Sequence, residues 1–240
     1  MPDTEGAPTF ILVPGAWMGA WCWHPVARLL RERGHGVVAL TLPGLSYGSS
    51  PAGLRMADAT GFVVSEVERR DLTNVVLVSH SWGGYPATAA AHQLARRVAK
   101  VIYYGAVVPA RDTSMADENP QYGQAIHESI AATPDGTVVI PLEAVRMGLM
   151  PAEPAPLQEL VFQLMLPQPG GYMTDRLDVP EVTKIGLDAA YVLGADDVSL
   201  ARPGTEFAGR LGVEPLMVPG GHLGLLSHPT DVADALISLL

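Results

Sequence analysis

The chain has 240 residues, of which 48% are hydrophobic and 17% are charged, so it is long and apolar enough for a large core and is not a disordered protein. Its formal net charge of −10 at pH 7 argues against nucleic-acid binding, which needs a basic surface. The single cysteine, Cys22, excludes an intramolecular disulfide and predicts a reducing, cytoplasmic environment.

Short apolar runs alternate with stretches of helical periodicity along the first 108 residues. Strands are predicted over residues 10–13, 36–42, 75–78 and 101–104, and helices over residues 24–33, 58–70 and 82–97. The alternation returns late, with strands predicted over residues 189–193 and 215–218 and helices over residues 206–211 and 231–240. Strands separated by helices of this length pair in parallel, so the pattern predicts a parallel sheet covered by helices.

Residues 109–180 interrupt this rhythm. The stretch holds many of the prolines and several methionines, with two helix candidates at residues 122–132 and 156–166. We expect a core domain of residues 1–108 and 181–240, and an insertion of residues 109–180 that lies as a cap over the carboxyl ends of the strands.

The predicted strand 75–78 leads into the motif Ser-His-Ser-Trp-Gly-Gly at residues 79–84. This layout is typical of a nucleophile elbow, the strand-to-helix turn that exposes a serine hydroxyl, although Ser79 stands at the first glycine of G-x-S-x-G. Ser81 is the predicted nucleophile. A serine before a helix is also a common helix cap, so the prediction depends on whether a base and an acid accompany it.

Both partners follow later strands. Asp196 and Asp197 come directly after the strand 189–193, and His222 follows a glycine-rich turn after the strand 215–218. The carboxyl ends of parallel strands meet at one edge of the sheet, where such groups converge. An aspartate there is usually a turn former and a loop histidine is often structural, but the joint order of serine, acid and histidine predicts a catalytic triad.

An acyl-transfer site also needs hydrogen-bond donors for the oxyanion of the transition state. In an elbow the first donor is the backbone N–H of the residue after the nucleophile, here Trp82. We assign the second to the backbone N–H of Ala16, in the glycine-containing loop after the first strand. His80, beside the nucleophile, is expected to support the elbow by hydrogen bonding.

With these residues the chain resembles the α/β-hydrolase superfamily, and within it the branch of plant-type methylesterases and hydroxynitrile lyases with their bacterial esterase-like relatives. Residues 10–23, FILVPGAWMGAWCW, are close to the opening motif of that branch, usually written with His-Gly-Ala-Trp. The resemblance spans nearly the whole chain and is weakest over residues 109–180. It implies an eight-stranded, mostly parallel sheet with a helical cap inserted before the last strands. It also implies a triad of Ser81, His222 and an aspartate that falls on Asp197, with Asp196 in reserve.

The chain departs from that branch at informative positions. Pro14 replaces the usual histidine of the oxyanion loop, and Ser79 replaces the first glycine of the elbow. The lyase members carry a lysine after the catalytic histidine and a hydroxyl residue in the oxyanion loop, whereas this chain has Leu223 and Gly15 there. Hydrolysis is therefore favoured over cyanohydrin cleavage.

The leading hypothesis is a serine hydrolase that cleaves a carboxylic ester of a small, partly apolar molecule, with no metal and no organic cofactor. Two alternatives stay open: an acyltransferase, cyclase or lyase-type biosynthetic enzyme on the same triad, and a ligand-binding protein with slow turnover. Five apolar side chains are candidates for a pocket roof, although plain packing would also explain them: Met147, Met150, Phe162, Leu164 and Met165.

The expected partner is a small-molecule ester, with no nucleic acid and no membrane, and a homodimer stays open. Residues 1–8 show no basic start and no apolar signal core, and no apolar stretch approaches the ~20 residues of a membrane span.

Overall fold

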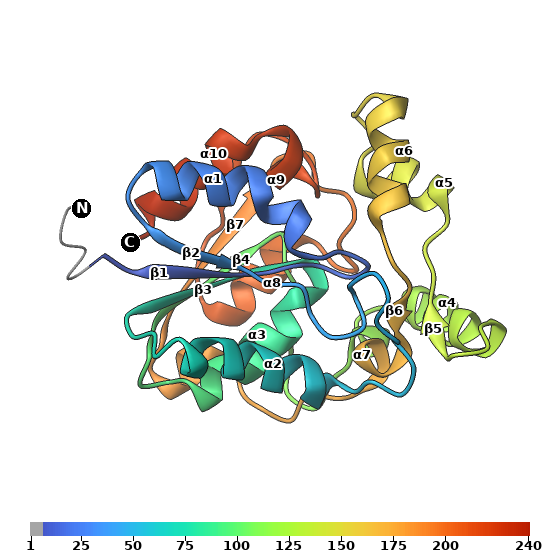
Figure 1. Ribbon diagram of the computed structural model, residues 1–240, viewed down its shortest axis with the longest axis horizontal. Coiled ribbons are helices and arrows are strands. Elements are labelled where there is room, and N and C mark those ends of the chain that lie inside the picture. Colours follow the sequence, from blue (N-terminus) through green and yellow to red (C-terminus); the bar gives the residue numbers. More distant parts are fainter. Residues whose placement is uncertain (1–6) are drawn as a thin grey trace.

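The computed structural model describes residues 7–240. Its centre is a parallel sheet of six strands in the order β2-β1-β3-β4-β7-β8, with helices on both faces (Figure 1). The strands are β1 (Thr9–Val13), β2 (Gly36–Ala39), β3 (Val75–His80), β4 (Val98–Tyr104), β7 (Asp188–Gly194) and β8 (Leu216–Val218). The predicted α/β-hydrolase type of fold, a mostly parallel sheet flanked by helices, is confirmed.

The main sheet has fewer strands than the resemblance implied. Among residues 7–240 it holds six strands rather than eight. Strand β4 pairs directly with β7, and the chain between them forms helices and a separate antiparallel pair. That pair consists of β5 (Thr137–Val138) and β6 (Gln168–Pro169), each two residues long. Pro169 has no N–H to donate, which limits how far such a pair can extend.

Strand β3 shows why these segments become strands of a parallel sheet. All six of its residues are buried. Side chains alternate along a strand, so Leu77 packs into the core on one face of the sheet, and Val76 and Val78 pack into the core on the other.

Two helical layers cover the sheet. One face carries α1 (His24–Glu32) and α10 (Pro229–Ser238), and the opposite face carries α2 (Met56–Arg69), α3 (Gly84–Gln93) and α8 (Gly204–Leu211) (Figure 1). The helices that were predicted between the strands are therefore present.

Several predicted boundaries shift. The strand predicted over residues 36–42 ends at Ala39, because its partner β1 ends at Val13 and the next residue, Pro14, cannot donate to the ladder. The helix predicted over residues 82–97 ends at Gln93, and the chain turns before β4 begins at Val98, three residues earlier than expected.

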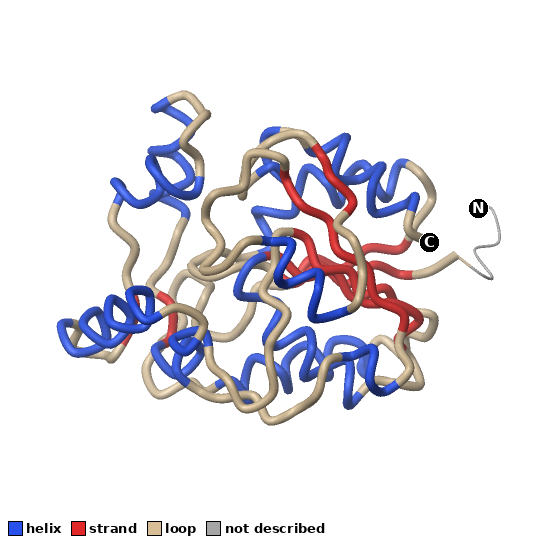
Figure 2. Tube along the Cα trace, turned by 180° about the vertical axis from the view of Figure 1, so that it is seen from behind, coloured by secondary structure: helices blue, strands red, loops and turns tan. Residues whose placement is uncertain are grey.

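Residues 109–180 are called the cap segment. Its helices α4 and α6 lie beyond the carboxyl ends of the strands, at the opposite end of the molecule from Leu240 (Figures 1 and 2). Its last residues run back along α3, where Pro180 O lies 2.8 Å from His92 Nε2. Besides β5 and β6, the segment forms η3 (Met115–Asp117), α4 (Pro120–Ala132), α5 (Leu142–Ala144), the π-helix η4 (Val145–Leu149), α6 (Ala155–Leu164) and α7 (Gly170–Thr174). Both helix candidates are present as α4 and α6. We propose that this segment is the cap of the site described below.

The prediction that the N-terminus carries no signal sequence concerns residues 1–8. Of residues 1–8, the first six lie outside the described part of the chain. No helix within residues 7–240 is both long and apolar enough to cross a membrane. Cys22 is a buried free thiol.

Candidate active site

The nucleophile elbow forms at the carboxyl end of β3. Ser81 has a φ of 53°, in the left-handed region that residues other than glycine rarely adopt. Two backbone hydrogen bonds hold it there: Ser81 N–H donates to Gly105 O (3.2 Å), and Val107 N–H donates to Ser81 O (3.0 Å). Such strained residues persist where their surroundings fix them, and they cluster at functional sites.

The two glycines of the motif are required by close backbone contacts. A Cβ atom on Gly83 would lie 2.4 Å from the carbonyl oxygen of Pro14, and one on Gly84 would lie 1.8 Å from that of Val107. Ser79, by contrast, is accommodated inside β3 with its side chain fully buried. Its Oγ has no hydrogen-bond partner among the described residues. The missing first glycine therefore leaves the elbow intact.

The structure brings Ser81, His222 and Asp197 together in one hydrogen-bonded chain. His222 Nε2 lies 2.9 Å from Ser81 Oγ, and His222 Nδ1 lies 2.9 Å from Asp197 Oδ2. The His222 and Asp197 side chains are only 3% and 1% exposed. Asp196 is exposed, and the carboxylate that contacts His222 Nδ1 is that of Asp197.

Electrostatics favour an ionised Asp197. Burial alone would raise the pKa of this carboxyl, but the attraction and hydrogen bond of His222 and the N–H of Ser199 outweigh it and lower the pKa below its usual range. Ser199 N–H donates to Asp197 Oδ1 at 2.9 Å, so both carboxylate oxygens are engaged. A carboxylate on Nδ1 places the hydrogen there and leaves Nε2 free to accept from the Ser81 hydroxyl.

His80 acts on a different group from the one that its position predicted. Its Nε2 lies 3.0 Å from the carbonyl oxygen of His222, and the two rings are 4.7 Å apart. Burial and the neighbouring His222 lower the pKa of His80 to about 3, so the ring is neutral near pH 7 and its Nε2–H donates to that carbonyl. The expectation that His80 supports the elbow by hydrogen bonding is wrong: it supports the backbone of His222.

Both candidate oxyanion donors belong to residues beside the nucleophile. A narrow cavity of about 30 Å³ is lined by Ala16, Ser81, Trp82 and His222, together with cap-segment residues. Among the described residues, no acceptor binds the backbone N–H of Ala16. Trp82 itself is anchored, because its indole N–H donates to Tyr172 O at 2.7 Å.

A larger apolar cavity of about 360 Å³ adjoins this one. The two share Trp17, Tyr122, Leu149, Met173 and Ser199. The larger cavity is lined by apolar side chains from α4, β5 and η4 and by no charged residue. A cavity of this character favours an uncharged, apolar group.

The predicted roof residues fall into different places. Met147 lines the 360 Å³ cavity, whereas Phe162 and Met165 line a neighbouring cavity of about 340 Å³ that shares Trp17, Val139 and Ile140 with it. Met150 packs in the core, and Leu164 lines neither of the two cavities. Of the five candidates, only Met147 therefore contacts the space beside the triad, and plain packing explains Met150.

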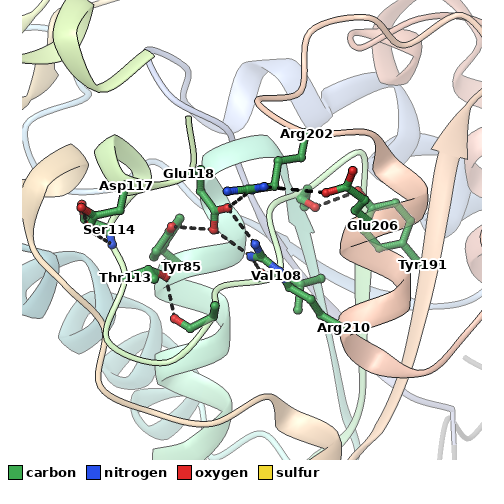
Figure 3. Close-up of polar contacts among 12 residues, drawn as sticks. Tyr85, Val108, Thr113, Ser114, Asp117, Glu118, Tyr191, Arg202, Glu206 and Arg210 are labelled. Carbon is green, nitrogen blue, oxygen red and sulfur yellow. Dashed lines mark hydrogen bonds and ion pairs between the residues drawn. The ribbon is translucent and has the colours of Figure 1, made fainter. Parts of the chain in front are cut away.

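A buried ion-pair cluster, missed in the sequence, joins the cap segment to the loops around the site (Figure 3). The Glu118 side chain is 2% exposed and accepts from Arg210 (2.8 and 2.9 Å), Arg202 (3.0 Å) and the hydroxyl of Tyr85 (3.2 Å). Tyr85 follows the elbow on α3, and Arg202 ends the loop that carries Asp197. No sequence signal distinguishes Glu118 from the other acidic residues around it.

Within residues 7–240 no group of three or more His, Cys, Asp or Glu side chains is placed to hold a metal ion.

Comparison with known proteins agrees with this geometry. The model of the alpha/beta hydrolase family matches residues 10–235. The carbendazim hydrolyzing esterase of Nocardioides sp. (strain SG-4G) is 34% identical over 108 residues, which cover 44% of this chain and 45% of that protein. The probable esterase PIR7A of rice (Oryza sativa subsp. japonica) is 27% identical over 98% of this chain and 97% of its own length.

A solved structure matches over nearly the full length. An extracellular alpha/beta-hydrolase from a Paenibacillus species, described as sharing structural and functional homology with tobacco salicylic acid binding protein 2, superposes with a TM-score of 0.91 at 20% identity. The match covers 97% of this chain and 98% of that one. Plant methylesterases are among the further matches, so the predicted resemblance to that branch is confirmed.

Proposed function

This chain belongs to the alpha/beta hydrolase family, and from that premise we propose that it hydrolyses carboxylic esters of small, partly apolar molecules through a covalent acyl-enzyme. The proposal rests on one observation above all: the continuous chain of two 2.9 Å contacts from Ser81 through His222 to Asp197. The esterases among the relatives support the same reaction class.

The acylation step follows from the roles of the three side chains. Ser81 Oγ attacks the ester carbonyl carbon while His222 Nε2 takes the hydroxyl proton, and Asp197 stabilises the imidazolium that forms. The carbonyl oxygen becomes an oxyanion that accepts from the Trp82 and Ala16 N–H groups. When the tetrahedral intermediate collapses, the C–O bond to the alcohol breaks and His222 returns its proton to the leaving oxygen.

Deacylation uses the same groups in reverse. Water replaces the alcohol and gives its proton to His222 Nε2 as its oxygen attacks the acyl carbon. The bond to Ser81 Oγ then breaks, and the proton returns to Ser81. The products are a carboxylic acid and an alcohol, and the enzyme is regenerated.

The substrate class follows from the 360 Å³ cavity beside the triad. Because no charged side chain lines it, a carboxylate or ammonium group placed there would lose its hydration without gaining a partner. We propose that the cavity takes an uncharged acyl or alcohol group.

Covalent labelling with a fluorophosphonate tests the proposal. The wild-type protein is expected to be labelled at Ser81, and Ser81→Ala, His222→Ala and Asp197→Ala are expected to lose the label. Asp196→Ala is the matched control and is expected to label as the wild type does. Labelling that persists in Ser81→Ala or His222→Ala would contradict the proposal, and loss in Asp196→Ala alone would move the acid to that residue.

A further inference from the structure

The loop that carries Ala16 is held by hydrogen bonds to the cap segment. Trp17, the next residue, has a φ of 65°, a left-handed conformation that a residue with a large side chain adopts only when its surroundings impose it. The contacts of Trp17 therefore bear on how the neighbouring residue Ala16 is held.

Three hydrogen bonds fix Trp17, and all of their partners lie in the cap segment. The backbone N–H of Trp17 donates to Gln168 Oε1 at 2.8 Å, and its carbonyl accepts from the Leu166 N–H at 3.0 Å. The indole N–H donates to the carbonyl oxygen of Val138 at 2.8 Å. Val138 and Gln168 are paired residues of the β5–β6 ladder, so this two-stranded sheet binds both the backbone N–H and the indole N–H of Trp17.

Of these three hydrogen bonds, only the one from Trp17 N–H to Gln168 Oε1 joins a side chain to the backbone of the oxyanion loop. Gln168 is fully buried, and among the described residues its Nε2 has no hydrogen-bond partner. An unpaired buried amide costs about 1–3 kcal/mol, so packing alone would favour an apolar residue here. The carboxamide is explained by the acceptor that its Oε1 presents to Trp17.

We propose that Gln168 is a positioning residue for the oxyanion hole. By accepting from Trp17 N–H, it holds the Ala16–Trp17 peptide and leaves the preceding N–H, that of Ala16, directed at the cavity beside Ser81. The inference rests on the proposed function, since it assigns Gln168 to the same oxyanion. It also gives the cap segment a second task besides enclosing the substrate.

The test compares Gln168→Met with Gln158→Met. Methionine keeps the length of the side chain and removes the acceptor. Gln158 is a matched control: it is also a buried cap-segment glutamine (7% exposed), and its hydrogen bond goes to Met150 O instead of the oxyanion loop. The measurements are kcat and KM for p-nitrophenyl acetate, Ki for an aryl trifluoromethyl ketone that forms a tetrahedral adduct with serine, and Tm.

Gln168→Met is expected to lower kcat by about 10- to 100-fold, less than the loss of a whole oxyanion donor, with KM within about twofold. The affinity for the trifluoromethyl ketone should fall in parallel, because the adduct carries the oxyanion. Gln158→Met should keep both within about twofold. Equal kcat in the two variants, with Tm lowered in each, would overturn the inference and leave Gln168 a packing residue.

Two further measurements complete the test. If Gln168→Met does not fold, Gln168→Asn withdraws the acceptor by one methylene while keeping the amide, and the same loss of kcat is expected. A folded Gln168→Asn variant with wild-type kcat overturns the inference. Failure of the proposed function is separate, because it would appear in the wild type: hydrolysis that survives in Ser81→Ala refutes the nucleophile whatever Gln168 does.

Discussion

The buried side chain of His80 contacts several parts of the candidate active site. Its ring lies between the elbow, to which it belongs by sequence, and the carbonyl of His222, to which its Nε2–H donates. A Cβ atom on Gly15 would lie 2.8 Å from His80 Nδ1, so the oxyanion loop packs directly against the same ring. The neutral ring therefore packs between the backbone of His222 and the oxyanion loop and helps to position both.

The depressed pKa of His80 predicts a pH-dependent stability. The unfolded chain binds a proton at this residue below its ordinary pKa of about 6.5, whereas the folded protein does so only near pH 3. The free energy of unfolding should therefore fall as the pH drops below 6.5, by up to about 1.4 kcal/mol per pH unit from this residue. Urea denaturation at pH 7 and pH 5 measures it.

The His80→Gln variant isolates this contribution, because glutamine keeps a donor but does not titrate. The loss of unfolding free energy between pH 7 and pH 5 should shrink by about 2 kcal/mol. His127→Gln, at an exposed position of α4, is the control and should leave the loss unchanged. An unchanged loss in His80→Gln would show that the ring is not buried as a neutral group.

The buried hydroxyl of Ser79 is expected to lower the stability of the protein. The hydroxyl is buried without a partner among the described residues, so Ser79→Ala should raise the free energy of unfolding by about 1 kcal/mol. The ester-hydrolysis rate should change less than threefold, roughly 0.6 kcal/mol, because the triad contacts do not involve this side chain. A fall in stability of about 1 kcal/mol or more would mean that the hydroxyl has a partner.

At the scale of elements, Glu118 is the contact that fastens the start of the cap segment to α3 and α8. Removing Glu118 leaves the partly buried Arg210 (21% exposed) and the buried Tyr85 hydroxyl without their acceptor, whereas Arg202 is 40% exposed and keeps its hydration. Glu118→Ala should therefore lower the free energy of unfolding by about 2 kcal/mol. Glu159→Ala is the matched control, since Glu159 pairs with Arg146 at the surface with half of its side chain exposed. Its effect should stay below about 1 kcal/mol, as chemical denaturation can measure.

Equal effects of the two substitutions would contradict the burial of Glu118. A large effect at Glu118 with retained kcat for small esters would instead separate the fastening of the cap segment from the chemistry of the triad.

The elements also show what the sequence could and could not predict. Strands such as β3 are buried on both faces, so their apolar runs are visible in one dimension, and the residues that follow them, Ser81 and His222, are found by position. The choice of Asp197 over Asp196 needed the resemblance, and the structure adds the contact to His222. Glu118 and Gln168 were missed because their roles come from partners far away in the chain, which no local pattern records.

On the scale of the whole molecule, a net charge of −10 and an uncharged cavity act in the same direction. An anionic ester is repelled at long range and would bury an unpaired carboxylate at short range. The value of kcat/KM for p-nitrophenyl butyrate should therefore exceed that for the mono-p-nitrophenyl ester of glutaric acid by about tenfold or more, a difference of roughly 1.4 kcal/mol.

Salt separates the two causes. The long-range part of the discrimination should weaken between about 0.01 and 0.5 M ionic strength, roughly the range over which the Debye length falls from 30 Å to a few ångström, and the short-range part should remain. Equal kcat/KM for the two esters at low salt would contradict the apolar substrate site.

If Ser81 is the nucleophile, it becomes acylated during turnover, and peptide mass spectrometry can detect the acyl group. The protein is mixed with excess p-nitrophenyl acetate, quenched with acid during steady turnover, digested and analysed by peptide mass spectrometry. We predict one acetyl group on Ser81 in the wild type and none there in Ser81→Ala or His222→Ala. An acetyl group on another residue that turns over at the rate of hydrolysis, or hydrolysis that continues at the wild-type rate in Ser81→Ala, would show that Ser81 is not the nucleophile.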